Sequence, residues 1–483
     1  MSLSGALSNA LSGLTASSRA ASVISSNVAN ALTDGYGPRD INLSTRLTGS
    51  HGGVQVDSVS RRADPRIIHD LRLASADRES SDVIATFHQR LETLLGTPED
   101  EFSLPAQIAK FENSLIAASS RPDLPERLET AVSAAKSLAQ TFTVASDSVQ
   151  AYREQADTDI ANAVDRINLL TKQVEDINVS LLTARNTGGD VNGLLDHRQK
   201  IIDEIAEYLP VREVPRQSGA VALMLPGGAF LIDGKARELG FAASPVITPY
   251  QSIEEGTLSG LTLDDQPLDP ASQQDMGEGR LSALFKIRDS LAPEIQTRLD
   301  TAARDLIERF QQSGLDTTRG AGSAGLFTDN NLAFVSTDER GIASRIAVSA
   351  SVLPEEGGAV WRLRDGLGAS APGVSGDATL LNDLRAALQE TRVPSSTSLG
   401  VSMTTASGLA SNLLSLTGSE RQRADEILAF DVTRQSELHE RLLENGVDTD
   451  QEMQRLLLVE QSYAANARMI QTASELLDIL IRI

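Results

Sequence analysis

The 483-residue sequence contains no cysteine, which excludes disulfide bonds, thiolate nucleophiles and cysteine-ligated metal sites. Aromatic residues make up only 4% of the chain, so its cores are expected to be built from Ala, Leu, Ile and Val. No apolar run approaches the ~18 residues that span a bilayer. The first twenty residues lack both a basic region and a continuous apolar region, so we expect no cleavable secretory signal.

Basic residues are fewer than acidic residues. The chain has 43 Lys and Arg and 66 Asp and Glu, which gives a net charge of −23. Such an excess repels phosphate backbones and anionic headgroups, so neither nucleic acid nor membrane is an expected partner. The charge is unevenly distributed. Residues 1–38 carry only Arg19 and Asp34, and residues 453–483 carry three basic and three acidic side chains. Two neutral ends on an acidic body indicate that the ends contact other protein.

Residue types that catalyse reactions or bind metals form no recognisable arrangement. The five histidines are scattered, without the spacing of a zinc site. His197 lies between Asp196 and Arg198, but adjacent side chains on a helix point about 100° apart and do not converge. The GAGSAG stretch near Ser323 lacks the Lys-Ser/Thr of a phosphate-binding loop. The sequence therefore predicts no enzyme, no metal site and no cofactor.

Both ends of the chain carry an apolar seven-residue repeat, the pattern of helices that pack against other helices. The N-terminal repeat comprises Leu7, Leu14, Ala21 and Val28, with Leu3, Ala10, Ile24 and Ala31 three or four residues away. The C-terminal repeat comprises Leu456, Tyr463, Ile470 and Leu477, with Val459, Ala473 and Leu480 three residues on. The other N-terminal positions are small and uncharged, which indicates burial on several sides. An amphipathic helix packed on its own domain is the alternative.

Helical periodicity also dominates the interior. We expect helices from Pro65 to about Leu95, over 126–187, over 419–444 and over 449–483. The span 126–187 contains no Gly or Pro and would be about 90 Å long if unbroken. A break near TFTVASDS is the alternative, because β-branched residues, Ser and Asp lower helix propensity there.

The residue pattern changes at Pro210. The short apolar runs that follow are separated by Ser-Gly, Pro-Gly-Gly and Asp-Gly, and this pattern predicts β-hairpins. The predicted fold class is mainly α with an inserted β-rich domain. Both the N- and C-terminal parts of the chain form a long helical rod, and the terminal heptad helices are paired. Three domains follow: residues 1–60 with 415–483 as terminal assembly helices, 61–210 with 277–414 as the helical rod, and 211–276 as the inserted β-rich outer domain.

The stretch SSNVANALTDGYGPRD (residues 25–40) resembles the N-terminal motif of bacterial flagellar axial proteins, the rod, hook and hook-associated family. The matching residues are Asn27, Asn30, Gly35, Tyr36 and Arg39. The C-terminal segment resembles the same family's closing helix through Glu452, Met453, Gln461, Tyr463, Ala467, Arg468, Ile470 and Leu477. The internal segments DPRIIHDLR, LLDHRQKIIDEI and GRLSALFKIRDSL are similar to hook-associated members. One departure is Gly37-Pro38, which places an extra residue between Tyr36 and Arg39.

The resemblance implies a structural subunit that forms the junction between hook and filament and polymerises through its terminal helices. It would be exported unfolded by the flagellar type III apparatus and function outside the cell in the flagellum. Its partners would be copies of itself, the hook protein on one side, the second hook–filament junction protein on the other, and an export chaperone on the C-terminal helix. The implied assembly residues are Leu3, Leu7, Leu14, Ile24, Asn27, Val28, Asn30, Tyr36, Leu456, Tyr463, Ala467, Ile470, Leu477 and Leu480.

Two alternatives remain from the sequence. A flagellar hook or distal-rod protein should have a mostly β body, which the helical span 126–187 opposes. A cytosolic helical scaffold or an unrecognised hydrolase is the alternative from a different class, and an enzyme would need a pocket with convergent titratable groups.

Overall fold

The computed structural model describes residues 3–33, 35–45, 52–270 and 272–482. This described chain is predominantly helical with four small antiparallel sheets, which confirms the predicted mainly α class. It divides into two compact units. Unit 1 comprises Met1–Arg78, Ile167–Glu238 and Asp431–Ile483, and unit 2 comprises Glu79–Arg166 and Leu239–Phe430.

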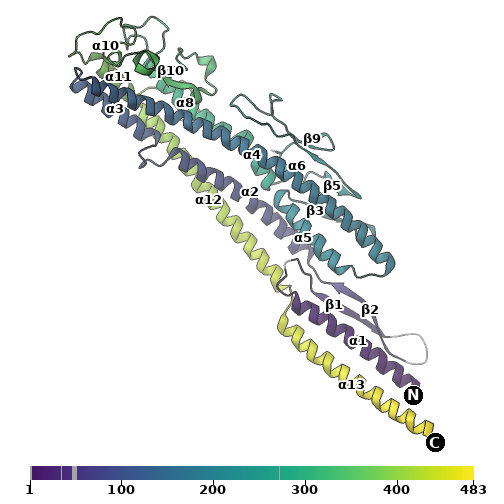
Figure 1. Ribbon diagram of the computed structural model, residues 1–483. Coiled ribbons are helices and arrows are strands. Elements are labelled where there is room, and N and C mark those ends of the chain that lie inside the picture. The colour runs from purple at the N-terminus through teal and green to yellow at the C-terminus, as the bar shows by residue number, and fades with distance from the viewer. Residues whose placement is uncertain (1–2, 34, 46–51, 271, 483) are drawn as a thin grey trace. The chain divides into compact units, whose positions relative to one another are not determined.

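The long helices follow the sequence prediction closely (Figure 1). Helix α2 covers Pro65–Leu95, and α4 covers Pro125–Thr187 without a break at TFTVASDS. Helix α12 covers Ala406–Glu444 and so begins earlier than the predicted residue 419, whereas α13 covers Thr449–Arg482. The boundary between the two units falls within α2, α4 and α12.

Unit 1 contains both terminal helices and two sheets. Its remaining elements are α1 (Leu3–Ala29), β1 (Arg39–Thr45), β2 (Val54–Arg61), α5 (Asn192–Tyr208), β3 (Arg212–Pro215), β4 (Val221–Met224), β5 (Phe230–Asp233) and β6 (Lys235–Ala236). Strands β1 and β2 form an antiparallel hairpin with a register shift between Asn42 and Leu43, and β3 to β6 form a four-stranded sheet in sequence order. The β1–β2 hairpin, inside the segment predicted as terminal helices, was not predicted from the sequence.

A buried arginine joins three elements of unit 1. The Arg72 guanidinium on α2 contacts Asp203 of α5 at 2.6 Å and also Glu213 of β3. Burial raises the pKa of the Asp203 carboxyl, and the charge of Arg72 opposes that rise. Because the two carboxylates share one buried cation, neither charge is left unpaired.

Unit 2 contains the largest continuous core. Its elements are α3 (Leu104–Ser120), β7 (Leu239–Gly240), β8 (Leu261–Leu263), β9 (Gln266–Leu268), α6 (Gln273–Met276), α7 (Arg280–Lys286), a π-helical turn (Ile287–Leu291), α8 (Ala292–Gln311), β10 (Phe327–Asp329), α9 (Ile342–Arg345), β11 (Ile346–Val348), α10 (Arg362–Asp365) and α11 (Thr379–Gln389). Phe111, Phe310 and Phe327 pack together at the centre of the core, with ring centroids 5.1 to 6.1 Å apart. Ala, Leu, Ile and Val make up most of the rest of this core, in line with the low aromatic content of the sequence.

The predicted β-rich segment 211–276 forms strands, but in two separate sheets. Strands β3 to β6 belong to unit 1, whereas β7 to β9 form a three-stranded sheet in unit 2. Each sheet is held to helices of its own unit by side-chain contacts, such as that of Glu175 on α4, whose carboxylate accepts from the Ala236 amide at 2.9 Å. The three-domain division therefore remains a proposal, and these packing units cut the chain at different positions.

An arginine with a fully buried side chain anchors the irregular chain around β7 to β9. Arg288 contacts Asp157 of α4 at 2.6 Å and donates to the Ser259 carbonyl at 3.0 Å. Its guanidinium also stacks over Phe285 and Phe241, 4.9 and 5.4 Å from the ring centroids. A guanidinium suits this position because its five donors and flat faces can all be used at once.

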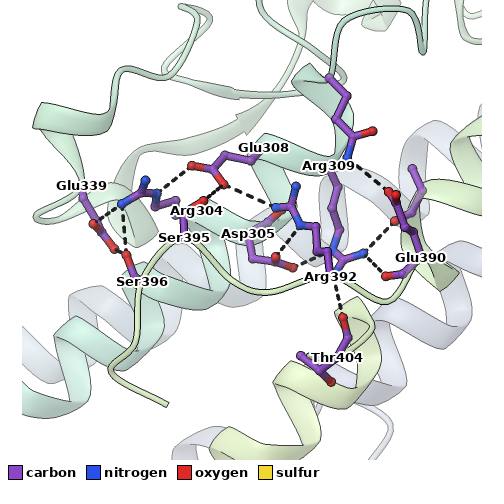
Figure 2. Close-up of polar contacts among 12 residues, drawn as sticks. Arg304, Asp305, Glu308, Arg309, Glu339, Glu390, Arg392, Ser395, Ser396 and Thr404 are labelled. Atoms are coloured by element: carbon purple, nitrogen blue, oxygen red, sulfur yellow. Dashed lines mark hydrogen bonds and ion pairs between the residues drawn. The ribbon is translucent and has the colours of Figure 1, made fainter. Parts of the chain in front are cut away.

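A second polar network holds the irregular segment between α11 and α12 against α8 (Figure 2). Arg309, whose side chain is fully buried, contacts Asp305 at 2.6 Å and donates to the carbonyls of Ala387, Glu390 and Thr404. Arg392 reaches the other oxygen of Asp305 at 2.9 Å. The segment has little regular secondary structure, so these side-chain bonds replace the ladder bonds that its backbone lacks.

We expect Arg309→Met to destabilise unit 2 by about 2–4 kcal/mol, because the carbonyls of Ala387 and Glu390 lose this donor and Asp305 loses one of its two guanidinium contacts. Chemical denaturation followed by fluorescence of Trp361, the single tryptophan, measures this loss in unit 2. Arg121→Met is the matched control, since the Arg121–Asp123 pair is exposed and should add nothing measurable. An equal effect of both substitutions would show that the buried network does not hold the segment.

The buried Asp300 on α8 should make the stability of the folded protein depend on pH. Burial raises the pKa of its carboxyl from 3.8 to about 6, although bonds from the amides of Ala343 and Gly341 and from Gln296 oppose the rise. The folded protein therefore binds this proton more tightly than the unfolded chain. The contribution of protonated Asp300 to the free energy of unfolding is complete below about pH 4 and is lost as the pH rises to about 6. Asp300→Asn should flatten this part of the stability–pH profile. Asp147→Asn, at an exposed position on α4, controls for net charge, and an unchanged slope in Asp300→Asn would contradict the assignment.

Candidate assembly interface

Helices α1 and α13 lie side by side in unit 1 and run in opposite directions, so the two ends of the chain are brought together (Figure 1). They approach closely where Gly13 meets Asn466, because a Cβ on Gly13 would lie 2.6 Å from the Asn466 Nδ2 atom. The other side of α1 contacts the β1–β2 hairpin, where the Ser12 hydroxyl accepts from the Val54 amide at 3.1 Å. One N-terminal helix thus joins a helix and a hairpin.

The predicted N-terminal residues occupy two different environments. Ile24 and Asn27 are buried, whereas Leu3, Leu7, Leu14, Val28 and Asn30 are only half-buried. The other buried apolar positions of α1 are Ala10, Ala16 and Ala20. Small residues lie at the centre because α1 is covered from two directions, so the leucines of the repeat remain at the edge of the contact.

The predicted C-terminal residues divide similarly. Leu456, Ala467 and Ile470 are half-buried on the side of α13 that faces α1. Tyr463 is 44% exposed and Leu477 is 38% exposed. Leu480 belongs to α13, but its side chain is outside the described part of the structure. Much of the predicted C-terminal repeat is therefore used inside one chain.

A second set of apolar side chains, which the repeat did not identify, is spread over the half of α13 that points away from α1. We call it the outer stripe. Its six side chains are between 45% and 63% exposed, and they are Met453, Leu457, Leu458, Met469, Leu476 and Ile479. A helix with apolar side chains on two opposite sides requires cover on both. These apolar residues are visible in the sequence, but they lie outside the seven-residue repeat, and that repeat identifies only one side of a helix as a contact surface.

The turn after α1 is built around the buried amide of Asn27, whose side chain is 1% exposed. Its Oδ1 atom accepts from the Tyr36 hydroxyl at 2.8 Å and from the Arg39 amide at 3.0 Å, and its Nδ2 donates to the Arg39 carbonyl at 2.9 Å. Arg39 also stacks over the Tyr36 ring, 5.2 Å from its centroid. Asn27 thereby fixes the start of β1 against the end of α1.

Asp196 on α5 joins the same turn to the rest of unit 1. Its carboxylate contacts Arg61 at 2.6 Å and Arg39 at 3.3 Å, and accepts from the Gly37 amide at 3.1 Å. A Cβ on Gly37 would lie 2.4 Å from Arg61 Nε, so the Gly-Pro insertion places its glycine where a side chain cannot fit. Gly35 has φ of 78°, a left-handed conformation that glycine adopts without strain.

The neighbours of Asp196 confirm that the Asp196-His197-Arg198 triplet does not converge. Arg198 points into unit 1, where it donates to Asn178 Oδ1 at 3.1 Å and to the Gly219 carbonyl at 2.8 Å, while His197 is exposed.

Among the described residues, none of the helices combines the length and apolar composition needed to cross a bilayer. Within the same part of the chain, no three His, Asp or Glu residues are grouped so as to hold a metal ion.

Comparisons with known proteins match the ends and the interior separately. Residues 88–327 match the flagellar hook-associated protein FlgK helical domain. Residues 7–36, which include most of α1 and part of the Asn27 turn, match the flagella basal body rod protein family. Residues 441–483, which include α13, match the C-terminal family of the flagellar basal body rod FlgEFG proteins.

Individual proteins are also similar to this chain. The chain is 23% identical to flagellar hook-associated protein 1 of Bacillus subtilis, over 98% of this chain and 97% of that protein. It is 25% identical to the Escherichia coli protein of the same name, over 66% of this chain and 59% of that protein. A solved structure of the flagellar hook junction protein FlgK from Burkholderia pseudomallei aligns with 54% of this chain and 46% of its own, at 21% identity and a TM-score of 0.46. The resemblance to flagellar axial proteins is thus confirmed: a relative named flagellar hook-associated protein 1 matches nearly the whole chain, and the FlgK helical-domain family matches its interior.

Proposed function

We propose that this chain, a structural protein of the hook-associated family, forms the junction between the flagellar hook and filament and polymerises through α1 and α13. The observation that carries the proposal is the outer stripe. One chain covers only the α1-facing side of α13 and leaves six large apolar side chains exposed on the other. Several large apolar side chains exposed on one helix are typical of a surface that contacts other protein.

The charge distribution supports contact between copies. Unit 2 contains 40 acidic and 22 basic residues, whereas unit 1 contains 26 acidic and 21 basic residues. Copies that meet through unit 2 would repel one another, whereas α1 and the outer stripe bring together surfaces with little net charge. Assembly through the terminal helices therefore avoids the electrostatic cost that the acidic unit would add.

The proposed partners are those that a junction subunit requires. They are further copies of the chain, the hook protein on one side and the second hook–filament junction protein on the other. We also propose that an export chaperone covers the C-terminal helix before assembly, that the chain leaves the cell through the flagellar type III apparatus, and that it functions in the extracellular flagellum. The relatives are flagellar structural proteins, and no catalytic activity is proposed.

The hook and distal-rod alternative has less support. The basal body rod families match only residues 7–36 and 441–483, whereas the interior matches the hook-associated helical domain. The unbroken α4 also differs from the mostly β body expected of such proteins.

We expect the double substitution Leu458→Glu and Leu476→Glu to block assembly without unfolding the monomer. Both side chains belong to the outer stripe and are 63% and 45% exposed, so their replacement removes little from the free chain. In the polymer, each change would place a charge in an apolar contact. Cells with this variant should secrete flagellin without retaining filaments, while the purified variant should keep the parent's circular dichroism and melting.

Leu332→Glu is the matched control, since Leu332 is 70% exposed but belongs to unit 2 and not to the terminal helices. This variant should assemble normally. Normal filaments in the double variant would overturn the outer stripe as the assembly surface. We prefer these positions to Ile470, because Ile470 is half-buried against α1 and its replacement would also disturb the monomer.

The Asn27 turn can be tested separately. We expect Asn27→Ala to weaken the attachment of β1 to α1 by about 1–3 kcal/mol, because the Tyr36 hydroxyl and the Arg39 backbone lose their buried partner. Hydrogen exchange of the β1 amides reports the change directly, and motility should fall with it. Asn30→Ala is the paired control, since the Asn30 side chain donates to the Ser26 carbonyl at 2.8 Å, within its own helix end. Equal exchange rates of the β1 amides in the two variants would contradict the role of Asn27 in attaching β1 to α1.

A further inference from the structure

The connector between α12 and α13 contains an asparagine followed by glycine, Asn445–Gly446, and Asn445 is exposed. We propose that Asn445 is a site of spontaneous deamidation, a modification that alters the connection between the two helices. The sequence contains one other Asn-Gly pair, Asn192–Gly193, and the fold holds that pair in a very different environment.

The reaction needs water and no other reactant. The Gly446 backbone nitrogen loses its proton and bonds to the Asn445 side-chain carbonyl carbon, and the side-chain amide group leaves as ammonia. Water then opens the resulting cyclic imide at either carbonyl, which yields aspartate or isoaspartate at position 445. Glycine favours the attack because it has no side chain to obstruct the ring and the widest range of backbone conformations.

The structure leaves few restraints on this pair. Gly446 donates its amide to the Leu443 carbonyl at 2.8 Å, and the Asn445 Nδ2 donates to the Arg441 carbonyl at 3.2 Å. Both bonds lie at the end of α12, where Leu443 is itself 59% exposed. Helix ends fray easily, and a brief opening breaks both bonds and frees the glycine nitrogen for attack.

Asn192 is restrained far more strongly. Its side chain is buried at the first residue of α5, and its Nδ2 donates to the Val59 carbonyl at 3.1 Å and to Asp190 Oδ1 at 3.0 Å. The helical backbone also fixes the position of the Gly193 nitrogen. Reaction at Asn192 therefore requires α5 to separate from β2, which is a larger opening than the fraying at Asn445.

Deamidation would change the end of α12 in three ways. The new carboxylate cannot donate to the Arg441 carbonyl, so that carbonyl loses its side-chain partner. It also adds negative charge beside Glu444 at the helix C-terminus, where the helix dipole disfavours anions. Isoaspartate further inserts one carbon into the backbone. Each effect favours fraying of α12 and loosens the connector to the assembly helix.

The test incubates the full-length protein at mildly alkaline pH and measures aspartate and isoaspartate at both positions by peptide mass spectrometry over time. We expect Asn445 to convert at least about tenfold faster than Asn192, which corresponds to about 1.4 kcal/mol of additional opening free energy at Asn192. Conversion at similar rates, or no conversion at Asn445, would overturn the proposal. Hydrogen exchange of residues 436–444 should rise in the converted protein, and unchanged exchange would refute the structural consequence.

Two variants and one condition complete the design. Gly446→Ala should slow conversion at position 445 through steric hindrance, and Asn445→Gln should remove it while keeping an amide donor. In denaturant, both Asn-Gly pairs should react at similar rates, because only the fold distinguishes them. A persistent difference in denaturant would show that local sequence, and not the structure, protects Asn192.

Discussion

Helix α13 has apolar side chains on two opposite sides, and a single chain can cover only one of them. Helix α1 covers one side, with Gly13 against Asn466 at the closest approach. Burying one large apolar side chain fully contributes about 1.5–3 kcal/mol, so burial of the outer stripe would contribute favourably to the association that we propose. The terminal pair is consequently both a folded element of the monomer and an incomplete one.

The residues that carry the family resemblance are mainly anchors of this fold. The Gly-Tyr-Gly-Pro-Arg turn and the LLDHRQK segment lie more than 150 residues apart in the chain, yet they meet where Asp196 contacts Arg39, Arg61 and the Gly37 amide. In the DPRIIHDLR segment, Arg72 contacts Asp203, and in unit 2 Arg288 is the buried arginine of GRLSALFKIRDSL. These motifs are therefore understood as charge pairs that hold distant segments together, and not as catalytic groups.

Arginine has the same role wherever unit 2 lacks regular structure. Arg288 holds the chain around β7 to β9, and Arg309 holds the segment between α11 and α12, each through backbone carbonyls and a buried carboxylate. Buried backbone that is neither helix nor strand needs donors from side chains, and a guanidinium supplies several from one residue. A protein with few aromatics and no disulfides can in this way fix long irregular segments.

The sequence by itself determined the helices whose apolar spacing extends over many turns, which include α2, α4 and α13, and it identified the neutral terminal repeats and the turn at Asn27. Local periodicity was sufficient there, because a helix is formed by bonds between residues four apart. Only the tertiary structure decided the β1–β2 hairpin, the split of segment 211–276 into two sheets, and the pairing of Asp196 with Arg39 and Arg61. It also decided which side of α13 faces α1 and which remains exposed. These features depend on contacts between residues far apart in the chain, and the spacing of residues along one helix does not specify which neighbour will cover each side.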